Sequence, residues 1–149
     1  MCCISSVAEA VLAISHGADA LGLVGEMPSG PGVIDDAIIC EIAKIAPPTV
    51  DTFLLTSRLS GDGIADHVVS CGTTTVQIVQ HIDVGEYKRI IKLVSSVRRV
   101  QVIHVEDESA LDLIEVYEPL LLSIRDSNCG SAHSIFRCCF TTRHNLLEN

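Results

Sequence analysis

The last part of the sequence gathers side chains that could bind a metal ion. Its cysteines and histidines follow the order C-x3-H-x4-C-C-x4-H, at Cys129, His133, Cys138, Cys139 and His144. Thiolate and imidazole groups are ligands that Zn²⁺ prefers. The spacing matches no regular zinc finger, and two adjacent cysteines rarely bind one tetrahedral ion. We therefore expect neither a metal site nor a bound cofactor.

Two other patterns suggest chemistry but lack the spacing that the chemistry needs. The stretch 28–32, Pro-Ser-Gly-Pro-Gly, could cradle a phosphate, but it lacks the lysine-containing spacing of a phosphate-binding loop. His81 and His104 each follow an apolar run, so we expect both at the ends of strands. A single histidine in such a place is more often structural than catalytic. We interpret 28–32 as a loop and the two histidines as structural.

Short aliphatic runs alternate with segments of helical periodicity. The runs begin near residues 2, 20, 51, 75, 100 and 121, and the helical segments cover about 7–14, 35–45, 62–71, 84–95 and 108–118. This alternation predicts an α/β protein with a parallel sheet. Periodicity alone leaves two architectures open. One is a flavodoxin-like open sheet, and the other is an incomplete (β/α)8 barrel with about five βα units and a sixth strand.

The composition excludes several classes of protein. The chain of 149 residues is 48% hydrophobic and 19% charged, which is too apolar for an intrinsically disordered protein. Its net charge of −9 argues against a nucleic-acid-binding surface. It has no apolar run long enough to cross a membrane and no signal-peptide pattern. The odd number of cysteines, seven, then favours a reducing compartment, and we expect a cytoplasmic protein.

The character of the chain changes after Asn128. Residues 129–149 contain Arg137 and Arg143 against Glu148, a net charge of +1 in a chain whose total is −9, and show no clear helix or strand period. We therefore predict a folded domain over 1–128 and a divergent, irregular tail over 129–149.

Four segments carry a resemblance to a known family. They are Met1-Cys2-Cys3-Ile4 with the helix start that follows, the stretch 16–24 (His-Gly-Ala-Asp-Ala-Leu-Gly-Leu-Val), Val76-Gln77-Ile78 and Asp126-Ser127-Asn128. In this order they resemble strands one, two, four and six of the phosphoribosylanthranilate isomerase family. The resemblance covers residues 1 to about 128, and it implies a TIM barrel rather than a flavodoxin-like sheet.

The family's reaction is an Amadori rearrangement of a phosphorylated small molecule, N-(5-phosphoribosyl)anthranilate, in tryptophan biosynthesis. It needs an acid to protonate the sugar ring oxygen and a base to remove the proton from C2. By resemblance, Cys2 is the base and Asp126 is the acid. A thiol can serve as a base when its pKa is lowered, and a buried carboxyl can serve as a proton donor.

The sequence also departs from the family pattern. Cys3 replaces a glycine, and the Ser-Pro-Arg loop that holds the anthranilate carboxylate corresponds to 29–32, which contains no arginine. Family strands seven and eight have no counterpart, so the chain resembles a C-terminally truncated member. We expect it to be impaired or inactive and to self-associate through the open edges of its sheet. The alternative is a non-catalytic fragment or binding protein that kept only the scaffold.

Overall fold

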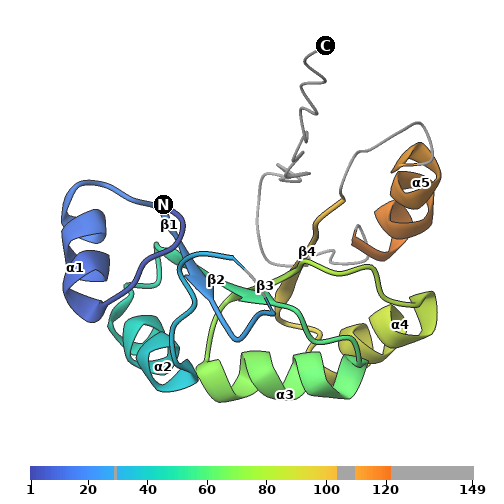
Figure 1. Cartoon of the computed structure of the whole chain (residues 1–149), viewed down its shortest axis with the longest axis horizontal. Coiled ribbons are helices and arrows are strands. Elements are labelled where there is room, and N and C mark those ends of the chain that lie inside the picture. Colours follow the sequence, from blue (N-terminus) through green and yellow to red (C-terminus); the bar gives the residue numbers. More distant parts are fainter. Residues whose placement is uncertain (29, 104–109, 122–149) are drawn as a thin grey trace, which may run out of the picture.

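Helices and strands alternate along the chain in the computed structural model, which describes residues 1–28, 30–103 and 110–121. The elements are α1 (Val7–Ser15), β1 (Ala20–Val24), α2 (Asp36–Ile45), β2 (Asp51–Thr56), α3 (Gly61–Cys71), β3 (Thr75–Ile78), α4 (Val84–Leu93), β4 (Arg98–Gln101) and α5 (Ala110–Leu121). Figure 1 shows the strands side by side, with helices α1 to α4 in an arc along one side of them. Among the described helices, none is long and apolar enough to cross a membrane.

The sheet has the strand order of a barrel. Its order is β1-β2-β3-β4 and every pair is parallel. The register aligns Gly22 with Phe53 and Phe53 with Thr75, so each strand lies beside the next one in the chain. A flavodoxin-like sheet would place the second strand outside the first. The described strands therefore confirm the barrel arrangement and exclude the flavodoxin-like alternative.

The segment predicted as the first strand is extended along β1 but is not a regular strand. Gly22 donates its N–H to Met1 O (2.7 Å) and accepts from Ile4 N–H through its own carbonyl (3.1 Å). A regular parallel ladder would place one residue fewer between these two partners. The extra residue is Cys3, whose φ of +59° interrupts the strand. The prediction of a strand near residue 2 was right about its place and wrong about its regularity.

The end of the described chain differs more from the sequence prediction. Helix α5 continues through Leu121, although we predicted its end before Pro119 and a sixth strand from about residue 121. Residue 121 is therefore helical. The remainder of the predicted sixth strand and the whole tail, 129–149, lie outside the described residues.

A side-chain cap and a left-handed glycine mark the two ends of α1. The Ser6 hydroxyl accepts the N–H of Glu9 (3.2 Å) at the start of α1, and Gly17 follows the helix with φ +87°. The Glu9 carboxylate accepts hydrogen bonds from the Ser5 N–H (2.8 Å) and the Ser5 hydroxyl (2.7 Å). These hydrogen bonds lower the pKa of Glu9.

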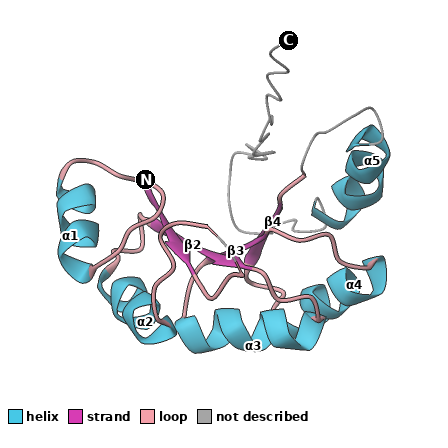
Figure 2. Cartoon of the chain, viewed as in Figure 1, coloured by secondary structure: helices cyan, strands magenta, loops and turns pink. Residues whose placement is uncertain are grey.

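The hydrophobic core lies between the sheet and the helices, and Figure 2 shows helices α1 to α4 along one side of the strands. The strands contribute alternate residues to it, which include Leu21, Leu23, Leu54, Val76 and Ile78. Phe53 and Leu55 point to the opposite face and are only half-buried. We call this second face, which the helices do not cover, the concave face. In a barrel it corresponds to the interior.

Candidate active site on the concave face

The Cys2 thiol lies on the concave face of the sheet. Leu21 and Leu23 are fully buried toward the helices, so Gly22 between them faces the other way. A Cβ atom on Gly22 would lie 3.0 Å from Cys2 Sγ and 3.1 Å from Cys2 Cα. Glycine at position 22 therefore leaves the space that the Cys2 side chain occupies.

Cys3 has a backbone conformation that favours glycine. Among the described residues it is the one non-glycine residue with positive φ. The left-handed region is strained for a residue with a Cβ atom. The resemblance places a glycine here. The cysteine keeps the backbone angle of a glycine and bears its strain.

The two neighbouring thiols interact. Cys2 Sγ and Cys3 Sγ lie 3.8 Å apart. The hydrogen bond with Cys2, followed by partial burial, raises the pKa of the Cys3 thiol. Cys3 is therefore protonated at neutral pH and can donate a hydrogen bond to the Cys2 sulfur.

The loop after β1 returns to cover this corner of the molecule. Ile34 donates its N–H to Val24 O (3.0 Å), which ties the far end of the loop to the end of β1. Within the loop, Gly32 has φ +82°, and a Cβ there would lie 2.9 Å from Cys3 Cβ. The loop assignment is confirmed for the described part, which omits Ser29. Its glycines allow it to pass closely over Cys3.

Two further candidates lie at the carboxyl edge of the sheet but are held by other contacts. Arg58 follows β2, and its guanidinium donates to Gly63 O (3.1 Å) in α3, so it points to the helix layer. The sequence analysis had not singled it out. His81, after β3, stacks on Tyr117 of α5 with ring centroids 6.3 Å apart. This contact agrees with the structural role predicted for His81.

The remaining sequence candidates cannot be placed beside Cys2. Asp126 and His104 lie outside the described residues, as do all five metal-binding candidates of the tail. The pairing of Cys2 with Asp126 stays a prediction.

Comparisons with known proteins find similarity to phosphoribosylanthranilate isomerases. No protein-family model matches the chain. It is 26% identical over 122 residues to N-(5'-phosphoribosyl)anthranilate isomerase 2 of Methanosarcina mazei. The aligned region covers 81% of this chain and 54% of that protein. The phosphoribosylanthranilate isomerase structure from Thermotoga maritima superposes with a TM-score of 0.67 at 19% identity. The chain is thus similar in sequence to one phosphoribosylanthranilate isomerase and shares the fold of others.

Other phosphoribosylanthranilate isomerase structures share the fold. The match to the Pyrococcus furiosus protein covers 86% of this chain and 61% of that protein, with a TM-score of 0.58 and 21% identity. A further structure, with reduced 1-(o-carboxyphenylamino)-1-deoxyribulose 5-phosphate bound, has a TM-score of 0.67 at 19% identity. The chain thus spans about half the length of the curated relative that it matches.

We predict that Cys3→Gly stabilises the protein. Glycine adopts φ +59° without strain, and relief of this strain stabilises the folded state by about 1 kcal/mol. Glycine also increases the conformational entropy of the unfolded chain, which offsets part of this gain. Urea denaturation measures the change. Cys2→Gly is the matched control, and it should destabilise the protein. An unchanged or lower stability of Cys3→Gly would contradict the strain at this residue.

Proposed function

We propose that the concave face carries the family's reaction, the isomerisation of N-(5-phosphoribosyl)anthranilate to its open-chain aminoketose. The Cys2 thiol in the space left by Gly22 is the observation that carries the proposal. It brings a candidate base to the face that forms the interior of a barrel. The name of the Methanosarcina mazei relative and the ligand bound in one related structure support the same substrate class.

The proposed mechanism has two proton transfers. The Asp126 carboxyl protonates the ring oxygen of the sugar, the C1–O bond breaks, and the nitrogen lone pair forms an iminium with C1. The Cys2 thiolate then removes the proton from C2, and the C–H electron pair neutralises the iminium to give an enol amine. Tautomerisation of the enol yields the ketone. The Cys3 thiol lies 3.8 Å from the Cys2 sulfur and can donate a hydrogen bond to it.

Substrate binding is the weak part of this site. The anthranilate carboxylate needs a cation, and the loop 25–34 contains neither arginine nor lysine. Arg58 is bound to α3 by its contact with Gly63. Without a charge-assisted pair, less binding energy is available to orient the substrate. We therefore propose that this chain turns over slowly.

Turnover is measured by the fluorescence decay of phosphoribosylanthranilate. We predict a slow reaction that Cys2→Ser and Asp126→Asn abolish, because each variant removes one proton-transfer group. Gly22→Ala should slow it as well, since the added methyl group displaces the Cys2 side chain. Gly85→Ala is the matched control, because a Cβ there meets no atom within 4 Å. Turnover that survives both Cys2→Ser and Asp126→Asn would assign the chemistry to other residues. If the unsubstituted chain itself shows no turnover, the result would favour the scaffold-only alternative.

The missing cation gives a gain-of-function prediction. Pro31 is an exposed residue of the loop segment that corresponds to the family's Ser-Pro-Arg. Pro31→Arg restores a partner for the anthranilate carboxylate, and kcat/KM should rise roughly tenfold or more, mainly through KM. Pro31→Ala separates the effect of the charge from that of losing the proline. Equal rates for the two variants would contradict the role assigned to the missing arginine.

We also propose that the protein self-associates and is cytoplasmic. In the described residues β4 pairs with β3 alone, and an uncovered strand edge can pair with another chain. The four described cysteines are free thiols, which suits a reducing compartment. Light scattering should give a mass above 16.0 kDa that rises with concentration. A monomer at all concentrations would contradict the self-association.

A further inference from the structure

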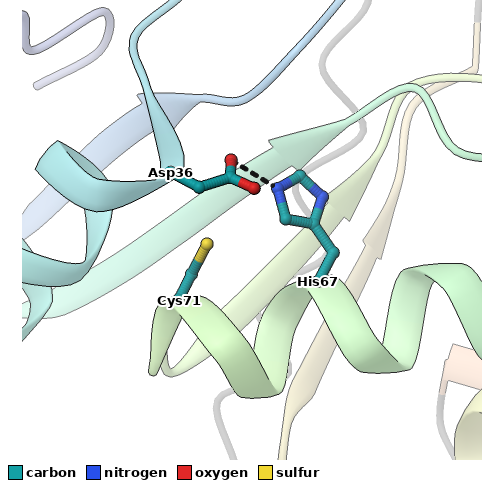
Figure 3. A group of neighbouring side chains, drawn as sticks. All are labelled: Asp36, His67 and Cys71. Atoms are coloured by element: carbon teal, nitrogen blue, oxygen red, sulfur yellow. Dashed lines mark hydrogen bonds and ion pairs between the residues drawn. The ribbon is translucent and has the colours of Figure 1, made fainter.

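Three potential metal ligands meet between α2 and α3, on the face of the sheet opposite to Cys2. They are Asp36, His67 and Cys71, and one donor atom from each lies within 4.8 Å of the others. Figure 3 shows the Asp36 carboxylate and the His67 ring in contact, with the Cys71 sulfur directed toward them from the next turn of α3. His67 Nε2 and Asp36 Oδ1 are 2.9 Å apart.

The His67 ring is held in one orientation. It is 1% exposed, and its Nδ1 lies 3.1 Å from the Thr56 hydroxyl. Gly25 flanks the ring so closely that a Cβ would lie 2.7 Å from His67 Cε1. Nδ1 is thus engaged by a polar partner and Nε2 is directed at the cluster. Metal-binding histidines are commonly oriented by such a contact at their second nitrogen.

A fourth potential donor, Cys40, lies nearby on α2 but outside this group of three. Cys40 lies one turn after Asp36, and its thiol donates to Ser70 O (2.9 Å), the residue before Cys71. Burial, the Asp36 carboxylate and the neighbouring Cys40 thiol raise the pKa of Cys71 to about 11. The Cys40 thiol lies beside the end of α3 that carries Cys71, because Ser70 directly precedes Cys71. Each helix thus contributes two donors at i, i+4 spacing, which places both on one face of that helix.

We propose that Asp36, Cys40, His67 and Cys71 form a metal site for Zn²⁺ or a cation of similar chemistry. Two thiolates, one imidazole and one carboxylate are a donor set that suits tetrahedral Zn²⁺ and not the oxygen-preferring Mg²⁺ or Ca²⁺. The Asp36 side chain, 47% exposed, leaves a path to solvent. The ion would replace the hydrogen bond between His67 and Asp36 and join α2 to α3. The proposal is independent of the isomerase function, because it uses none of the residues assigned to that reaction.

Co²⁺ is the probe for this site, because tetrahedral cobalt thiolates absorb in the visible and near ultraviolet. The chain contains five other cysteines, so the titration is run in parallel on the unsubstituted chain and on a background with these five changed to serine. They are Cys2, Cys3, Cys129, Cys138 and Cys139. We expect the background to bind one equivalent of Co²⁺ with thiolate charge-transfer bands. Zn²⁺ should displace the Co²⁺ and raise the Tm.

Substitutions within the cluster separate this site from adventitious binding. Cys40→Ala and Cys71→Ala should each weaken the charge-transfer bands, and Asp36→Asn should weaken Co²⁺ binding at least tenfold. Asp36 is exposed, so its variant tests the site without disturbing the core. Asp66→Asn, at an exposed position of α3, is the matched control and should bind like the background.

Two results would overturn the proposal. One is a folded background, verified by circular dichroism, that shows no thiolate bands with Co²⁺. The other is a band in the unsubstituted chain that survives Cys40→Ala and Cys71→Ala, which would assign the metal to the remaining cysteines.

Discussion

Parallel pairing of the strands in sequence order places each connecting helix on the same face of the sheet. A right-handed crossover carries the chain back over that face before the next strand begins. Leu21, Leu54 and Val76 are buried against the helices as a result, and this one-sided core stabilises the structure. The opposite face is left to side chains such as Cys2. The same pairing brings the ends of β1, β2 and β3 to one edge, where the loops can approach both faces.

Two glycines close together in the sequence give functional side chains their room on opposite faces of this sheet. Gly22 leaves space for Cys2 on the concave face, and Gly25 leaves space for His67 on the helix-covered face. A methyl group at either position would meet the neighbouring side chain at 3.0 Å or less. The absence of a Cβ atom at these two glycines thus allows the candidate base and the candidate metal ligand to pack closely against the backbone.

Cys3 connects the strain of the backbone to the chemistry of the site. Its left-handed φ adds a residue between the two hydrogen bonds that attach Met1 and Ile4 to Gly22. Ile4 can therefore enter the core while Cys2 stays on the concave face. The strain is offset by the hydrogen bonds on either side and by the burial of Ile4. The family resemblance requires a glycine for this conformation, and the cysteine adds a second thiol to the corner.

The sequence by itself determined the four regular strands, the helices between them and the resemblance to phosphoribosylanthranilate isomerases, because apolar periodicity and local motifs are properties of neighbouring residues. It misjudged the segment near residue 2, since an apolar run does not reveal a left-handed residue within it. It also ended α5 too early, because Pro119 is a helix breaker in general but α5 continues through it. The i, i+4 pairs Asp36 with Cys40 and His67 with Cys71 are visible in the sequence, but they lie on two separate helices. Only the packing of α2 against α3 brings Asp36 to His67 and Cys71, because the contact between helices is set by the whole sheet and not by either helix alone.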